Sequence, residues 1–215
     1  MYAVVKRMFD LGVSAIGLVV LAPVLTIAAA MIRLTMREPA IFKQERPGYL
    51  ERPFTLLKFR TMLTANDSHG RPLPDSIRLT RLGRLLRRTS MDELPQLWNV
   101  LRGDMSLVGP RPLLMEYLAR YTQEQRQRHL VRPGITGWAQ IHGRQDIPFS
   151  QRIELDNWYV RNLSLRLDVS ILLQTAEKAL LGSGVLSGQD VHAVDDLNPP
   201  RSADCAHASL EHTAP

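Results

Sequence analysis

The longest apolar run of the chain lies near its N-terminus. Residues 11–32, LGVSAIGLVVLAPVLTIAAAMI, contain no formally charged side chain over twenty-two positions. An α-helix rises about 1.5 Å per residue, so this run is long enough to cross a hydrocarbon layer about 30 Å thick. Few polar positions are left to face water, which argues against the core helix of a soluble protein. The pattern therefore predicts a helix inserted in a membrane.

Two courses of this helix through the membrane fit the sequence. Pro23 near its centre removes a backbone hydrogen bond and predicts a kink. Basic residues flank both ends, whereas a spanning helix usually shows a bias to one side; they are Lys6, Arg7, Arg33, Arg37 and Lys43. A re-entrant helix that leaves on its entry face fits these features, and a kinked spanning helix fits equally well. A cleavable secretory signal is disfavoured, because the apolar run exceeds the usual length and Asp10 stands at the junction.

The remaining pattern predicts a mainly helical α+β protein with a small β element. Apolar and aromatic residues in 40–62, interrupted by Pro47-Gly48, predict short strands joined by a turn. Helical spacing recurs in 77–88, where arginines alternate with leucines, and in 113–130 and 150–181. These segments divide the chain into a membrane helix with its flanks (1–37), a main folded domain (38–182) and a flexible C-terminal tail (183–215) that is poor in large apolar residues.

Composition narrows the classes of partner. The 215-residue chain has a net charge of +6 and a pI near 9.9, which favours anionic partners such as nucleic acid, acidic lipids or phosphorylated substrates. Its one cysteine, Cys205, excludes an intrachain disulfide.

Two adjacent acids, Asp92 and Glu93, stand among the basic residues of RRTSMDELPQLWNVLRGDMSLVGPRP (87–112). One interpretation is structural: Ser90 and Glu93 have the spacing of a capping box at the start of a helix. The other is chemical. Adjacent carboxylates can hold Mg²⁺, Arg111 between two prolines offers a bidentate fork for phosphate, and an ionised carboxylate can attack phosphorus. Further positive charge would come from Lys58, Arg60, Arg87 and Arg88. The residues thus favour phosphoryl chemistry.

These residues, in this order, closely resemble the bacterial sugar transferases known as small monotopic phosphoglycosyl transferases. The resemblance covers about residues 1–185, and DELPQLWNVLRGDMSLVGPRP is its most specific part. Other matching segments are KRMFDLGVSAIGLVVLAPV, KFRTM, VRPGITGWAQIHGR and LDNWYV.

The resemblance implies a bacterial inner-membrane enzyme that acts on the cytoplasmic face. It implies transfer of a sugar 1-phosphate, with an N-acetylated hexose expected, from a UDP-sugar to undecaprenyl phosphate, with release of UMP, as the first membrane step of surface glycan or glycoprotein synthesis. Asp92 would be the nucleophile of an aspartyl-phosphosugar intermediate, Glu93 its partner, and Mg²⁺ the cofactor held by both. Lys58, Arg87 and Arg111 would lie at the active site, with Arg60 and Arg88 adding charge.

The same resemblance implies a re-entrant first helix kinked at Ala22-Pro23, with both termini cytoplasmic. Many relatives have serine before this proline, so here the kink depends on Pro23. Amphipathic helices such as 165–181 would seat the enzyme on the membrane lipids, although core packing explains them as well.

A membrane-anchored basic module that binds or scaffolds without catalysis is the alternative function. The net charge and the arginine stripe support it. The convergence of cations on two acids and the lack of a recognised nucleic-acid motif argue against it, so no nucleic-acid partner is expected.

Overall fold

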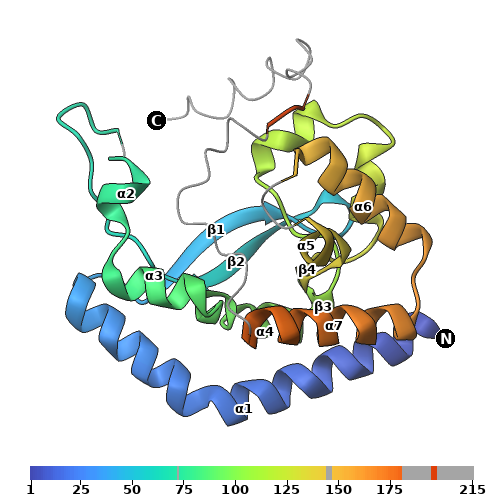
Figure 1. The fold of residues 1–215 in the computed structure, drawn as a ribbon, viewed down its shortest axis with the longest axis horizontal. Coiled ribbons are helices and arrows are strands. Elements are labelled where there is room, and N and C mark those ends of the chain that lie inside the picture. The colour runs from blue at the N-terminus through green and yellow to red at the C-terminus, as the bar shows by residue number, and fades with distance from the viewer. Residues whose placement is uncertain (72, 144–146, 181–194, 198–215) are drawn as a thin grey trace, which may run out of the picture.

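A computed structural model describes residues 1–71, 73–143, 147–180 and 195–197 (Figure 1). The α-helices of this part are α1 (Tyr2–Met36), α2 (Asp75–Arg78), α3 (Arg81–Arg88), α4 (Gln96–Arg102), α5 (Trp138–His142), α6 (Phe149–Arg161) and α7 (Leu165–Leu180). Its strands are β1 (Ile41–Pro47), β2 (Pro53–Phe59), β3 (Ser106–Val108) and β4 (Gly134–Thr136). Its 3-10 helices are η1 (Tyr49–Glu51), η2 (Met91–Glu93), η3 (Met115–Arg120) and η4 (Gln125–Leu130). This composition confirms the predicted mainly helical α+β class.

The helix α1 is continuous and runs along one side of the molecule, with a bend near its middle (Figure 1). Pro23 lies inside α1 and interrupts its hydrogen-bond ladder. One turn later, the Thr26 hydroxyl donates to the Ala22 carbonyl oxygen at 2.8 Å, a side-chain contact that often bends helices. Two local causes of bending therefore fall in the same turn, the second supplied by Thr26 and not by the residue before the proline.

Buried polar contacts fix the N-terminal half of α1 to the domain. The Asp10 side chain is buried and accepts hydrogen bonds from the Ser106 hydroxyl at 2.7 Å and the Leu107 amide at 3.2 Å. Lys6 pairs with Asp168 of α7 at 2.8 Å. A buried carboxylate is costly unless it is hydrogen-bonded or paired, so these contacts specify one orientation of the helix.

The C-terminal half of α1 is part of the hydrophobic core. Ala28, Ile32 and Met36 are buried and cluster with Phe59 of β2 and Leu86 of α3. The segment is thus a structural element of the domain, which argues against a removable signal sequence. Apolar side chains are exposed along the opposite face of both halves; they include Val4, Met8, Ile16, Val19, Val20, Ile27, Met31 and Leu34. Within the described residues, α1 is the helix long and apolar enough to cross a membrane.

The predicted strands within 40–62 form an antiparallel hairpin that pairs Ile41 with Phe59 and Pro47 with Pro53. Asn99 of α4 is fully buried and completes the open edge of β2. Its amide nitrogen donates to the Thr55 carbonyl at 2.8 Å, and its carbonyl oxygen accepts from the Leu57 amide at 3.1 Å. One side chain therefore satisfies two backbone groups and joins β2 to α4.

Two predicted helices are wrong in detail, and threonines explain both. The segment 113–130 forms η3 and η4 in place of one helix, because Thr122 and Gln125 form a capping box that starts a new turn. The segment 77–88 is broken between α2 and α3. There the Thr80 hydroxyl accepts from the Gly83 amide at 2.9 Å and caps α3. The segment 150–181 forms α6 and α7, in line with its predicted helical spacing.

The predicted tail, 183–215, lies outside the described residues except for 195–197. In this short piece Leu197 is buried beside Tyr117 and Phe149, and Asp195 pairs with Arg120 at 2.7 Å.

Replacing Asn99 with alanine should lower the free energy of unfolding by roughly 2 kcal/mol, because two partly buried backbone groups of β2 lose their hydrogen-bond partners. Thermal unfolding of the purified protein in mild detergent measures the effect. The matched control is Asn66→Ala at an exposed loop position, which should unfold like the parent. Equal stability of both variants would show that water replaces the Asn99 amide.

Candidate active site

The acid pair lies in η2, the short turn that joins α3 to α4. Ser90 before it has a left-handed backbone conformation with φ of 56°, which is uncommon for a residue other than glycine. Its side chain makes no capping hydrogen bond. The capping-box interpretation of Ser90 and Glu93 is therefore wrong. The Glu93 side chain instead contacts residues from two other parts of the fold.

Glu93 joins β2 and the loop after β3 through two cations. Its Oε1 atom accepts from Lys58 Nζ at 3.0 Å and from Arg111 Nη2 at 2.5 Å, and its Oε2 atom accepts from Arg111 Nη1 at 3.3 Å. Burial opposes ionisation of Glu93, but the charges of Arg111 and Lys58 outweigh it and hold its pKa well below the usual range. Burial lowers the pKa of Lys58 in turn, and Glu93 raises that of Arg111. We call Lys58, Glu93 and Arg111 the Glu93 clamp.

Asp92 has a different environment from its neighbour. Its carboxylate makes no hydrogen bond to any described residue and is only partly buried. Burial and the adjacent Glu93 charge raise its pKa, against the opposing charges of Lys58, Arg111 and Arg87. The pair thus consists of one carboxylate fixed by two cations and one without a hydrogen bond to any described residue.

The other predicted phosphate-binding arginines take three different positions. Arg87, half buried on α3, donates from Nε to the Thr61 hydroxyl at 3.1 Å and acts electrostatically on Asp92. Arg60 pairs with Glu38 at 2.8 Å and does not contact the acid pair. Arg88 is exposed on the outer face of α3. The structure therefore brings Lys58, Arg87 and Arg111 together around the two acids.

The backbone of the loop that carries Arg111 packs closely against the segment around Arg132 and Gly134. A Cβ atom on Gly109 would lie 2.4 Å from the Arg132 carbonyl oxygen, and one on Gly134 would lie 2.1 Å from the Gly109 nitrogen. Both positions therefore require glycine. This packing explains why VGPRP and RPGITG form one unit although they are apart in the sequence.

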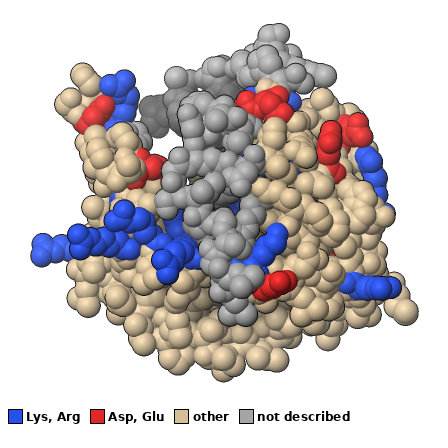
Figure 2. All heavy atoms as spheres, in the orientation of Figure 1, with Lys and Arg blue, Asp and Glu red and all other residues tan. Residues whose placement is uncertain are grey.

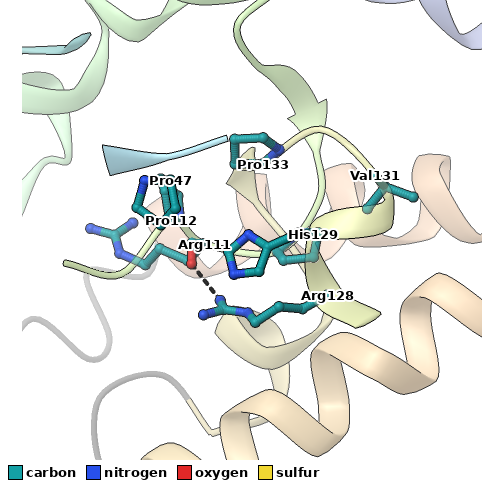
Figure 3. Close-up of a pocket in the computed structure, with 8 residues that line it drawn as sticks. Pro47, Arg111, Pro112, Arg128, His129, Val131 and Pro133 are labelled. Carbon is teal, nitrogen blue, oxygen red and sulfur yellow. Dashed lines mark hydrogen bonds between the residues drawn. The ribbon is translucent and has the colours of Figure 1, made fainter. Parts of the chain in front are cut away.

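Arg128 of η4 supports the same loop from a buried position that the sequence analysis did not identify. Figure 3 shows its guanidinium at the Arg111 carbonyl oxygen, 2.6 Å away, while the Arg111 side chain points to the other side. Arg128 also pairs with Asp156 of α6 at 2.7 Å and donates to the Tyr121 hydroxyl at 3.0 Å. No spacing rule links these residues, since they meet only after η4 folds against α6.

The oxygen atoms at the site suit a hard cation only in part. No group of three or more acidic, histidine or cysteine side chains converges among the described residues. Both Asp92 oxygens are free of hydrogen bonds to described residues, whereas three cationic contacts already occupy Glu93. If Mg²⁺ binds here, Asp92 would be its main protein ligand, and substrate phosphates and water would supply the other ligands.

The family model described as bacterial sugar transferase matches residues 1–182. The uncharacterized sugar transferase EpsL of Bacillus subtilis is 52% identical over 190 residues, which cover 88% of this chain and 94% of that protein.

Longer relatives carry the same region as one part of their chains. The undecaprenyl-phosphate glucose phosphotransferase of Komagataeibacter xylinus is 44% identical, over 81% of this chain and 36% of the relative. A UDP-N-acetylgalactosamine-undecaprenyl-phosphate N-acetylgalactosaminephosphotransferase of Aeromonas hydrophila is 38% identical, over 85% of this chain and 45% of the relative. The chain thus spans less than half the length of these two proteins. From the family match over residues 1–182, the chain belongs to the bacterial sugar transferase family.

Proposed function

We propose that this protein is a phosphoglycosyl transferase that moves a sugar 1-phosphate from a UDP-sugar to undecaprenyl phosphate. The observation that carries the proposal is the free Asp92 carboxylate beside the Glu93 clamp. Three cations face two carboxylates there, so a surplus of positive charge is available for a diphosphate. The named activities of the relatives from Komagataeibacter xylinus and Aeromonas hydrophila support the same reaction.

The first step of the proposed reaction is attack by an Asp92 oxygen on the phosphorus that bears the sugar. An oxygen–phosphorus bond forms, the bond to the UMP oxygen breaks, and the electron pair leaves with UMP. Arg111, Lys58 and Arg87 neutralise the charge that develops on the phosphate oxygens. In the second step an oxygen of undecaprenyl phosphate attacks the same phosphorus and releases the Asp92 carboxylate.

Glu93 keeps the cations in place during both steps. It fixes Arg111 and Lys58 while the charge on Asp92 is consumed and restored, so the site reorganises little. Mg²⁺, held mainly by Asp92 with the substrate diphosphate, would supply further charge neutralisation on the phosphates.

The placement we propose is the cytoplasmic face of the bacterial inner membrane, with α1 re-entrant. In support, both halves of α1 pack against the same domain (Figure 1). Apolar side chains are exposed along the outer face of α1. The helix α7 exposes Val169 and Leu173 and provides a second apolar contact, while its Ile171 packs in the core. In this placement α1 would lie at the membrane boundary with both of its ends on the domain side.

The sugar we expect is an N-acetylated hexose in a surface-glycan or glycoprotein pathway. The relatives differ in the sugar they are named for, glucose in one and N-acetylgalactosamine in another. UMP release with UDP-glucose, UDP-galactose, UDP-N-acetylglucosamine and UDP-N-acetylgalactosamine, each with undecaprenyl phosphate and Mg²⁺, identifies it.

Replacing Asp92 with asparagine should reduce UMP release by at least about a thousandfold, because the neutral amide lacks the ionised carboxylate that attacks phosphorus. Turnover is measured with undecaprenyl phosphate in detergent, and thermal unfolding establishes that the variant is folded. The control is Asp75→Asn, the same chemical change at an exposed ion pair with Arg78. Parental turnover by Asp92→Asn would exclude Asp92 as the nucleophile.

The raised pKa of Asp92 makes turnover sensitive to acid. Only the ionised carboxylate attacks, so the rate should fall as pH drops through a pKa higher than that of an ordinary carboxyl group. Burial is the first cause of this shift and the Glu93 charge the second. Glu93→Gln removes the second cause and so lowers the pKa of Asp92. The acidic limb of the pH–rate profile, where the rate falls with pH, should therefore lie at lower pH in this variant than in the parent. Glu116→Gln, exposed on η3, removes the same charge elsewhere and should leave the limb in place. A limb that does not move in Glu93→Gln would contradict the coupling.

A re-entrant α1 places both termini on one side of the membrane. Ala3→Cys in a Cys205→Ser background and the natural Cys205 should react with an impermeant maleimide from the same side of sealed inner-membrane vesicles. Labelling after detergent addition measures the total thiol in each case. Reaction of the two cysteines from opposite sides would show that α1 spans the membrane.

A further inference from the structure

The outer face of α3 carries arginines that the active site does not use. Successive residues of an α-helix are about 100° apart, so Arg81, Arg84, Leu85 and Arg88 share one face. All four side chains are exposed, and Leu85 has 52% of its surface accessible. We call these four residues the α3 strip.

Close packing on the inner face of α3 prevents rotation of the helix, so the strip stays turned away from the active site. A Cβ atom on Gly83 would lie 1.9 Å from the Thr61 carbonyl oxygen, and Leu86 is buried. Arg87, on this inner side, donates to Thr61. Arg81, Arg84 and Arg88 have no hydrogen bond or ion pair with any residue that the structure describes. Three guanidinium groups are therefore held outward without an internal partner.

The helix α3, which carries the strip, packs against α1 through a different face from the strip. Leu82 and Leu86 of α3 pack against the cluster that includes Ala28 and Ile32 of α1. The same stretch of α1 exposes Ile27 and Leu34 on its other side, at 61% and 80%. In Figure 2 the lower band of the molecule, where Figure 1 shows α1, has almost no charge, and a row of basic side chains lies directly above it at the level of α3.

We propose that the α3 strip binds the headgroups of anionic phospholipids in the bilayer that receives α1. Guanidinium groups beside an apolar face reach headgroup depth when that face is inserted, and an exposed leucine among them is typical of interfacial helices. Each arginine near an anionic surface strengthens membrane binding about fivefold, so the three together contribute about a hundredfold. The proposal rests on the membrane placement of α1 proposed above.

The test is partition of the full-length protein from diluted detergent solution into vesicles, measured by flotation. One set of vesicles is pure phosphatidylcholine and the other contains about one third phosphatidylglycerol. The variant Arg81→Gln/Arg84→Gln leaves Arg88, which the sequence analysis assigned to substrate, unchanged. It should lose about 25-fold in binding to the anionic vesicles and nothing on the neutral ones. The difference should shrink at 0.5 M NaCl, because salt screens exposed charges.

The matched control is Arg52→Gln/Arg161→Gln, which removes the same charge from two exposed positions outside α3. Equal losses in both variants, or no preference of the parent for anionic vesicles, would overturn the proposal. Retained vesicle binding with reduced UMP release in neutral micelles would also overturn it and assign these arginines to substrate phosphate. A parent protein that binds neither vesicle would instead reject the membrane placement of α1, and its UMP release in detergent would still report on Asp92.

Discussion

The ion cluster around Glu93 is the interaction on which the site depends. It joins a strand, a turn and a loop that are far apart in the sequence, because Lys58, Glu93 and Arg111 meet at one carboxylate. A partly buried carboxylate is stable only with such partners, and two cations this close together need the acid between them. The same contacts that hold the fold together here concentrate positive charge beside Asp92. The stability of the site and the phosphate recognition that we propose therefore have one physical source.

Support for this cluster extends outward through buried polar contacts. Arg128 holds the Arg111 backbone and is itself fixed by Asp156, while Asn99 ties the strand of Lys58 to α4. In α1, the Asp10 carboxylate accepts a hydrogen bond from Ser106 and so attaches this mainly apolar helix to the domain. Each contact gives a buried polar group a protein partner in place of water. Together these contacts favour one arrangement of the elements over others. The reaction that we propose needs this rigidity, since phosphoryl transfer depends on positioning.

The sequence predicted those parts of the protein that local patterns encode. The apolar run predicted α1, the alternation around Pro47-Gly48 predicted the hairpin, and the DE and Pro-Arg-Pro motifs predicted Asp92, Glu93 and Arg111 as neighbours. Long-range pairing was not accessible: Arg60 and Arg88 look equivalent to Arg87 in sequence, yet one pairs with Glu38 and one faces outward. Capping by Thr80 and Thr122 changed two predicted helices, because a single hydroxyl can end a segment whose apolar spacing continues.

A bond between the Asp92 carboxylate and phosphorus is the central claim, and mass spectrometry tests it most directly. The protein is mixed with UDP-sugar and Mg²⁺ without undecaprenyl phosphate, quenched in acid and digested. The peptide that contains Asp92 is expected to gain the mass of one sugar phosphate, which disappears when the lipid acceptor is added before quenching. An unmodified Asp92 peptide, together with UMP release that requires the acceptor, would contradict a covalent intermediate.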